Sequence, residues 1–264
     1  MDKKIGFYGA GNMAEAIING LIRSALYSPD QIIAYDVDQN RVAYMQEQYE
    51  ISFASDEEAL LKIADICVLA IKPQILPVLE SKPFIKKYSG ILISVLAGTS
   101  VESLGKVFSF AKIVRTMPNA PALVAEGMTG ICYADDLTVQ EKADVDQIFS
   151  SVGEIIEVKE EHLAAVTGIS GSGPAYVFVF AEAMADAAVL CGLSRKDAYL
   201  LAAQTIAGSA AMIQKTGKHP GELKDMVTSP GGTTIEAIKS LEENGFRNAV
   251  MEAVISSYQK SKQL

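Results

Sequence analysis

A glycine-rich turn near the N-terminus constrains the fold of this 264-residue chain more than any other feature. Gly9-x-Gly11-x-x-Ala14 follows the apolar run Lys4–Tyr8 and opens the segment Asn12–Arg23, whose apolar residues recur at helical spacing. In this setting the first glycine permits a tight turn, the second lets the backbone approach a pyrophosphate, and a small third residue lets helix and strand pack. An ordinary strand-to-helix turn is the alternative, but the setting favours dinucleotide binding at the helix N-terminus.

Strand-like and helix-like segments alternate through the first half of the chain. We expect strands at residues 4–8, 31–35, 64–71, 91–96 and 112–116, a helix between 38 and 48, and further short strands at 129–134 and 155–158. The run Ala64–Ile71 is nearly all apolar, as in strands buried on both faces. The alternation predicts an α/β domain with a Rossmann-like, doubly wound parallel sheet.

The sequence changes character near residue 160. No convincing strand follows, and Ala175–Cys191, Arg195–Lys215 and Phe246–Lys262 are long, alanine-rich and helix-forming. Their apolar content is high for so few helices to bury alone, which predicts pairing with a second subunit. We therefore expect a nucleotide-binding domain over residues 1–160 and an all-helical domain for substrate binding and dimerisation over residues 161–264.

Charge and composition exclude several function classes. The formal net charge of −9 and the absence of a long basic run disfavour nucleic-acid binding. The N-terminus lacks signal-peptide architecture and no apolar stretch reaches membrane-spanning length by inspection, so we expect a cytoplasmic protein without a membrane partner. With two histidines and three widely separated cysteines, no metal site is expected.

Asp36, at the end of the second expected strand, is the candidate ribose-binding acid. It lies 22 residues beyond Ala14, close to the usual offset of about 20. A carboxylate there accepts hydrogen bonds from the ribose hydroxyls and repels a 2′-phosphate, which favours NADH over NADPH. Arg41 is the nearby cation and leaves the NADPH alternative open, and a solvated loop carboxylate is the simplest alternative to both.

Other loops border the same expected cleft, because ligands bind outside the carboxyl ends of strands in open α/β sheets. Residues 70–73, 96–98 and 115–121 each follow a strand, and each is also compatible with a plain loop. Gly168–Pro174 is glycine-rich but follows no strand, so we interpret it as a tight domain-joining turn before a buried helix. Ser229–Thr234 precedes a helix and is equally compatible with a small-anion site or with an ordinary N-cap by Thr233 or Thr234.

Several segments together resemble the pyrroline-5-carboxylate reductase family from Lys4 to about Ser261. They are IGFYGAGNMAEAI, ADICVLAIKPQ, RTMPNAPALVAEGMT, GSGPAYVFVFAEAMADAA and, most specifically, HPGELKDMVTSPGGTTIEAIKSLEENGFR. The resemblance implies reduction of L-1-pyrroline-5-carboxylate to L-proline by hydride from NADH or NADPH, the last step of proline biosynthesis. It also implies a Rossmann domain, a helical domain interlocked with a partner chain, and homo-oligomers that are dimers or decamers.

The resemblance assigns roles to individual residues. Thr234 would contact the imine nitrogen as the catalytic residue. The substrate carboxylate would be held by Ser229, Gly231, Gly232 and Thr233. The cofactor would be bound by Asp36, by the turn residues Tyr8, Gly9, Ala10, Gly11, Asn12 and Met13, and on its nicotinamide side by Ala70, Ile71, Lys72, Pro73, Val95, Leu96 and Ala97.

Two rival interpretations are weaker. A β-hydroxyacid dehydrogenase would carry a lysine about one helical turn after the second-domain glycine motif, and the residues after Gly173 include none there. A nucleotide redox sensor would bind cofactor without turning over substrate, which the intact SPGGTT segment disfavours.

Overall fold

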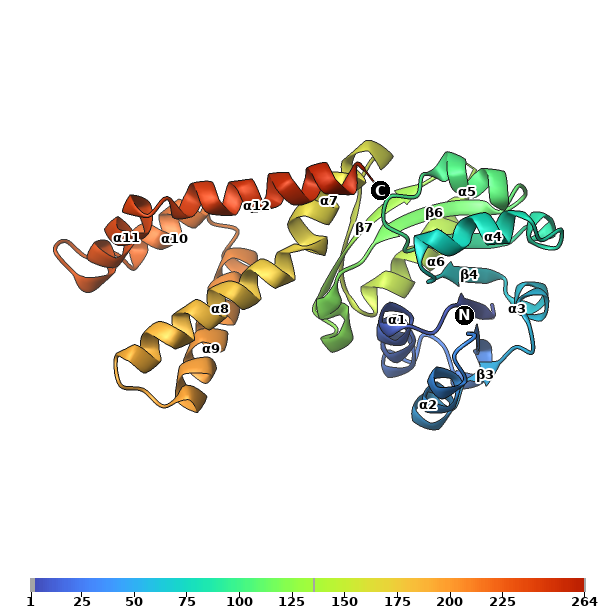
Figure 1. The fold of residues 1–264 in the computed structure, drawn as a ribbon, viewed down its shortest axis with the longest axis horizontal. Helices are drawn as coiled ribbons and strands as arrows, with labels where there is room; N and C mark the ends of the chain where they lie inside the picture. Colours follow the sequence, from blue (N-terminus) through green and yellow to red (C-terminus); the bar gives the residue numbers. More distant parts are fainter. Residues whose placement is uncertain (1–2, 135, 264) are drawn as a thin grey trace. The chain divides into compact units, whose positions relative to one another are not determined.

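The computed structural model describes residues 3–134 and 136–263, which form two compact units (Figure 1). One unit comprises Met1–Ser172 with Ser256–Leu264, and the other comprises Gly173–Ile255. The division expected between residues 160 and 161 stays a prediction.

The first unit is built on an eight-stranded sheet of order β3-β2-β1-β4-β5-β6-β7-β8. The strands are β1 (Ile5–Tyr8), β2 (Ile32–Tyr35), β3 (Ser52–Phe53), β4 (Ile66–Leu69), β5 (Ile91–Ser94), β6 (Lys112–Met117), β7 (Gly127–Tyr133) and β8 (Gly153–Glu157). β2 and β4 lie on opposite sides of β1, so the direction in which successive strands are added to the sheet reverses there, as in doubly wound folds. The α/β fold class is confirmed. Among the described strands, the two-residue edge strand β3 is the one that the sequence did not predict.

Helices cover both faces of this sheet. They are α1 (Asn12–Arg23), α2 (Gln39–Tyr49), α3 (Glu57–Ile63), α4 (Leu76–Glu80), α5 (Val101–Val107), α6 (Val139–Ser150) and α7 (Leu163–Val166). Alternate strand residues point to opposite faces, so two cores form. Ile5 and Phe7 pack with the buried side chains of α1, α2 and α6, while Tyr8 packs with those of α3, α4 and α5.

The far end of the sheet departs from the predicted parallel arrangement. β7 pairs antiparallel with β6, and β8 then pairs parallel with β7. The connection from β6 to β7 spans only residues 118–126 and contains the short 3₁₀ helix Ala120–Val124. A crossover between parallel strands needs a dozen or more residues, so this short connection imposes the antiparallel pairing.

Helices make up the second unit, and none of its described residues lies in a strand. The helices are α8 (Gly173–Leu190), α9 (Arg195–Thr216), α10 (Pro220–Met226), α11 (Thr233–Glu243) and the first part of α12 (Phe246–Ser261). Inside the unit, the rings of Phe180 and Phe246 are 5.9 Å apart and the Tyr176 hydroxyl donates to the Ala253 carbonyl at 3.3 Å. These contacts join the start of α8 to α12.

The glycine-rich segment before α8 is not a tight turn. Thr167–Gly171 forms a π-helical turn that follows α7 directly and is separated from α8 by the single bend residue Ser172. Gly171 packs closely against Met117, since an added Cβ would lie 2.9 Å from the methionine Cε, the end of a flexible side chain that can shift. π-helical turns are uncommon and often occur at functional sites.

In a single copy of the chain, large apolar side chains of the second unit are exposed to solvent. Val177, Phe178 and Val179 are consecutive along α8 and are 44%, 66% and 66% exposed. Consecutive residues point to different sides of a helix, so exposed apolar side chains occupy more than one side of α8. The expected buried helix is therefore exposed within a single chain, and such a surface marks an interface.

One helical run in the described chain, Glu160–Leu190, is long and apolar enough to cross a membrane by length and composition. The expectation that no stretch reaches that length was wrong. Sequence inspection divided the run at its glycines, whereas the π-helical turn carries the helix through them. Helices that pack inside soluble proteins pass the same length and composition test.

Candidate functional site

The turn between β1 and α1 depends on Gly9. Its φ of +99° lies in the left-handed region, and an added Cβ would stand 2.5 Å from the Ala70 carbonyl oxygen. The Gly9 N–H donates to the Tyr35 carbonyl at 2.8 Å, and the Ala70 N–H donates to the Tyr8 carbonyl at 2.9 Å. Gly9 therefore lets the chain leave β1 while remaining bonded to β2 and close to the end of β4.

Beyond Gly9, the turn opens toward solvent. Gly11 is the N-cap residue of α1 and no side chain caps this helix. Gly11 and Asn12 are exposed, and a Cβ added at Gly11 would meet nothing within 4 Å. The first N–H groups of a helix have no intrahelical partner, so uncapped ones with open space before them suit a pyrophosphate. The residues present fit a dinucleotide.

Asp36 follows β2 and lies against this turn. Its Oδ2 accepts a hydrogen bond from the Ala10 N–H at 2.7 Å, and its Oδ1 accepts one from the Asp38 N–H at 2.9 Å. The half-buried carboxylate thus stabilises the turn itself. Each carboxylate oxygen has lone pairs beyond the one bond recorded for it, so ribose hydroxyls can still donate to it.

A second polar group beside the turn carries no sequence motif. The Arg41 guanidinium donates to the Ala10 carbonyl through Nε and pairs with Glu15 through Nη2. Glu15 Oε1 also accepts hydrogen bonds from the hydroxyls of Tyr44 and Tyr49, both at 2.9 Å. Sequence reasoning noted Arg41 but missed its partners. The available signal was an acid in the first turn of α1 and a basic–aromatic pair three residues apart on α2.

The loops that follow β4 and β5 lie at the same edge of the sheet. Val95 N–H donates to the Leu69 carbonyl at 3.2 Å, and Leu96 N–H donates to the Ser94 hydroxyl at 3.3 Å. Lys72 and Pro73 are exposed, Leu96 is buried, and Ala70, Ile71, Val95 and Ala97 are intermediate. Parallel pairing of β1, β4 and β5 therefore brings the predicted cofactor loops to one edge of the sheet.

A cavity of about 150 Å³ opens beside the β5 loop. Leu96, Ala97 and Gly98 line it together with Arg115 from β6 and Glu160. The Arg115 guanidinium pairs with the Glu160 carboxylate at 2.8 Å, and the same carboxylate oxygen accepts the Val101 N–H at 2.7 Å. The arginine is thereby neutralised at the wall of the cavity.

Asn119 links the loop after β6 to the π-helical turn. Its amide nitrogen donates to the Ser170 carbonyl at 3.0 Å, and its amide oxygen accepts the Met128 N–H at 2.9 Å. The side chain belongs to a residue only 8% exposed. The loop over residues 115–121 is therefore bonded to the segment that begins the helical region.

Tyr8, one of the predicted cofactor-binding residues, can contact the cofactor only through its backbone, because its side chain is buried against the sheet. Its ring meets the Tyr35 ring edge-on at 5.7 Å. Among the residues the structure describes, its hydroxyl is the buried side-chain polar atom without a hydrogen-bond partner. Burial and the nearby Glu57 carboxylate raise the pKa of Tyr8 far above its ordinary value, so this phenol stays protonated.

The second predicted site lies in the helical unit, at the start of α11. Gly232, rather than Thr233 or Thr234, is the N-cap residue, and no side chain caps the helix. The Gly232 N–H donates to the Ser229 carbonyl at 3.1 Å, and an added Cβ at Gly232 would lie 2.3 Å from the Ser229 hydroxyl. The threonine-capping alternative is therefore excluded, and the N–H groups of the first turn are uncapped.

Gly231 shapes the same turn with a φ of +65°. Ser229, Gly231 and Thr233 are exposed, whereas Gly232 and Thr234 are intermediate. Two uncapped helix starts, at α1 and α11, thus coincide with the two segments predicted to bind anionic ligands.

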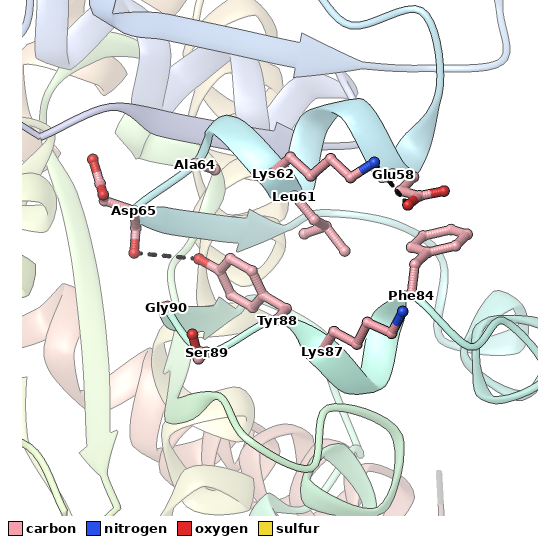
Figure 2. A pocket seen from close by; sticks show the side chains of 10 residues that line it. All are labelled: Glu58, Leu61, Lys62, Ala64, Asp65, Phe84, Lys87, Tyr88, Ser89 and Gly90. Carbon is pink, nitrogen blue, oxygen red and sulfur yellow. Dashed lines mark hydrogen bonds and ion pairs between the residues drawn. The ribbon is translucent and has the colours of Figure 1, made fainter.

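The larger cavity, about 390 Å³, lies at the opposite edge of the sheet. Asp65 and Gly90, which precede β4 and β5, line it, and the Tyr88 hydroxyl donates to the Asp65 carbonyl at 3.3 Å (Figure 2). Ligands of open α/β sheets bind at the carboxyl ends of strands, so we assign the chemistry to the other edge despite the smaller cavity there. No group of three or more metal-ligating side chains occurs in residues 3–134 and 136–263.

Comparison with known proteins identifies the family. Over its full length the chain is 47% identical to the pyrroline-5-carboxylate reductase of Escherichia coli, covering 99% of that protein. The chain belongs to the pyrroline-5-carboxylate reductase family. Residues 160–264 match the family model described as pyrroline-5-carboxylate reductase dimerisation, and residues 4–98 match that described as NADP oxidoreductase, coenzyme F420-dependent.

Solved structures agree with this membership. The Plasmodium falciparum pyrroline carboxylate reductase, determined with NADP bound, is 37% identical with a TM-score of 0.89, covering 99% of this chain and 98% of that one. The Coxiella burnetii pyrroline-5-carboxylate reductase is 32% identical with a TM-score of 0.91, covering 100% and 98%. The family resemblance predicted from the sequence is confirmed. The dimerisation match also includes α8, whose apolar side chains are exposed in one copy.

Proposed function

We propose that this protein reduces L-1-pyrroline-5-carboxylate to L-proline with hydride from NADH or NADPH. The full-length similarity to the Escherichia coli reductase carries this conclusion. The uncapped starts of α1 and α11 support it, since each offers backbone N–H donors to one anionic ligand. The reaction is the last step of proline biosynthesis, and we place the enzyme in the cytoplasm.

The cofactor is assigned to the carboxyl edge of the first unit. The N–H groups at the start of α1 would hold the pyrophosphate against Gly11, and Asp36 would accept the ribose hydroxyls. Residues 70–73 and 95–97 would border the nicotinamide. When bound there, the reduced nicotinamide supplies the hydride. The half-buried carboxylate of Asp36 favours NADH, because a 2′-phosphate beside it would be repelled.

Substrate is assigned to the turn before α11. The uncapped N–H groups after Gly232 and the hydroxyls of Ser229 and Thr233 would bind the single carboxylate of the substrate. Gly231 and Gly232 let the backbone approach it closely, because neither carries a side chain. A small ring acid needs no larger site than this.

Thr234 is assigned the contact with the imine nitrogen. Hydride adds to the C=N carbon most easily when the nitrogen is protonated, so the site needs a hydrogen-bonding group there and no strong base. A threonine hydroxyl can orient the protonated imine and a water molecule beside it. The scarcity of histidine in this chain is compatible with that chemistry.

The decisive assay follows nicotinamide absorbance with purified protein, pyrroline-5-carboxylate and each cofactor. We expect turnover by the wild type and a loss of kcat of about 10²-fold or more in Thr234→Ala, within the range of a positioned hydrogen-bonding group. Absence of turnover by the wild type with both cofactors contradicts the proposed function.

A separate control isolates the role of the hydroxyl. Thr234→Ser keeps the hydroxyl and should retain most of the rate, whereas Thr234→Val keeps the shape and should not. Equal activity of Thr234→Val and the wild type would remove the role assigned to this side chain and leave the proposed reaction intact.

A further inference from the structure

Arg41 is held in place at three points beside the cofactor turn. Its Nε donates to the Ala10 carbonyl, its Nη2 pairs with Glu15, and its guanidinium carbon lies 5.0 Å from the centre of the Tyr44 ring. The Arg41 side chain is 22% exposed and that of Glu15 is 14% exposed. Arg41 is therefore not a free surface cation that swings toward an arriving ligand.

Glu15 is the centre of this arrangement. Its Oε2 accepts a hydrogen bond from the Arg41 guanidinium, and its Oε1 accepts hydrogen bonds from the hydroxyls of Tyr44 and Tyr49. Burial raises the pKa of Glu15, but the hydrogen bonds from Arg41 and the two tyrosines outweigh it and hold the pKa below its ordinary value. Glu15 is thus ionised at neutral pH and balances the charge of Arg41.

The same turn residue also binds Asp36. Ala10 donates its N–H to the Asp36 carboxylate at 2.7 Å and accepts from Arg41 through its carbonyl. The carboxylate assigned to the ribose and the cation beside it are thereby held on the two sides of one residue. With Arg41 balanced by Glu15, the Asp36 carboxylate bonded to Ala10 leaves a net negative charge beside the turn.

We propose that Glu15 is a cofactor-specificity residue, which lowers the affinity for a 2′-phosphate by neutralising and restraining Arg41. The proposal rests on the assignment of NAD(P)H to this edge. Asp36 disfavours a 2′-phosphate directly, by repulsion. Glu15 disfavours it indirectly, because Arg41, the cation beside the turn, is already paired with Glu15. Glu15 touches neither substrate nor cofactor in this scheme and acts by positioning.

Two single variants test the proposal because they shift the same ratio in opposite directions. Glu15→Gln keeps the shape but removes the negative charge, so the affinity for NADP⁺ relative to NAD⁺ should rise roughly fivefold or more. Arg41→Met leaves Glu15 unbalanced, so the same ratio should fall. Isothermal titration calorimetry with NAD⁺ and NADP⁺ gives both dissociation constants, and kcat/KM for NADH and NADPH gives a second readout.

Controls separate positioning from a general structural effect. In Glu15→Gln/Arg41→Met the gain for NADP⁺ should disappear, because the freed cation is gone. Glu102→Gln removes an exposed carboxylate of the same unit, which pairs with Lys106 on α5, and should leave the ratio unchanged. Thermal melting of each variant identifies any that fails to fold, and the opposite variant then carries the test.

The outcomes distinguish the two levels of proposal. If the wild type binds neither dinucleotide, the proposed function fails. If the wild type binds them but Glu15→Gln weakens both equally or leaves the ratio unchanged, Glu15 is only structural and the inference is overturned. Persistence of the NADP⁺ gain in the double variant also overturns it, since the gain would then not come from Arg41.

Discussion

Two glycines of one turn have different physical reasons to be glycine. Gly9 combines a φ of +99° with a Cβ position 2.5 Å from a backbone oxygen, so the fold itself requires it. Gly11 has an ordinary backbone conformation and open space around its Cβ position, so nothing within the protein requires it. The space before Gly11 is what the proposed pyrophosphate would fill.

Gly9→Ala and Gly11→Ala should therefore fail in different ways. We expect Gly9→Ala to lower the free energy of unfolding by about 1–3 kcal/mol, because the left-handed backbone and the contact with Ala70 both resist a side chain. Gly11→Ala should change it by at most about 1 kcal/mol, as for other N-cap substitutions. Its affinity for the dinucleotide should nevertheless fall at least about tenfold, which corresponds to about 1.4 kcal/mol. Urea unfolding and cofactor titration measure the two quantities.

Equal cofactor affinity of Gly11→Ala and the wild type would contradict the placement of the pyrophosphate.

At the scale of single residues, sequence patterns predict the turn but not every contact beside it. The Gly-x-Gly-x-x-Ala spacing predicts the turn, but the pairing of Glu15 with Arg41 joins residues 26 positions apart on two helices. No local sequence pattern encodes that contact, because it forms only when α1 packs beside α2 in the folded protein.

At the scale of elements, the N-terminus of α6 is bonded to the sheet as well as capped. Thr138 and Glu141 form a reciprocal capping box, and Lys112 on β6 pairs with Glu141 at 2.7 Å. These hydrogen bonds, that from Lys112 foremost, lower the pKa of Glu141 from 4.5 to about 2. The carboxylate is thus favoured in the folded protein relative to the unfolded chain.

The stabilisation from Glu141 should disappear in acid. Because the folded-state pKa is depressed, the contribution is complete above about pH 4.5 and is lost as the pH falls toward 2. Glu141→Gln should lower the free energy of unfolding by about 1 kcal/mol at pH 7, a value limited by solvent screening of a partly exposed pair, and by less at pH 3. Urea unfolding at both pH values, at one protein concentration, measures the difference.

Glu243→Gln is the matched control, since it removes an exposed carboxylate paired with Lys239 four residues away. Little change is expected for it at either pH. A difference between Glu141→Gln and the wild type that is as large at pH 3 as at pH 7 would show that the carboxylate charge does not contribute as inferred.

The elements differ in how far the sequence alone predicts them. β4 and β5 are buried at every position, and such strands read as unbroken apolar runs. β3 has only two residues, too few for a periodic signal. Glycines ordinarily end helices, so the sequence predicts a break at residues 168–173, whereas Thr167–Gly171 forms a π-helical turn. At α11, only the backbone geometry decides between a threonine cap and the glycine cap that forms.

At the scale of the whole molecule, the helical unit has few interior positions within one chain. Among its described residues, the buried apolar side chains are those of Ala185, Ala198 and Ala202, while larger ones such as Phe178 are exposed. Alanine buries little area, so the unit requires a partner surface to remove its larger side chains from water. The dimerisation family match over residues 160–264 agrees with this requirement.

Phe178→Asp should therefore weaken self-association. Burying an aspartate in an apolar interface is unfavourable, so the sedimentation coefficient should fall toward that of a monomer at micromolar concentration. Val139→Asp is the control, because Val139 is 88% exposed on the sheet-containing unit and an acid is favourable in the first turn of α6. Unchanged sedimentation of a folded Phe178→Asp, verified by circular dichroism, would exclude its surface from the interface.

The path of α12 has a consequence for biosynthesis. Its last residues belong to the sheet-containing unit, where the Ser257 hydroxyl lies 2.7 Å from that of Ser172 and Ser261 is buried. Ser261 and Lys262 also line the cavity beside the β5 loop. A ribosome must therefore translate the whole helical unit before the first unit receives its final segment. The lining of the cavity beside the β5 loop stays incomplete until then, although all eight strands have already been translated, which ties completion of the proposed nicotinamide side to synthesis of the oligomerising helices.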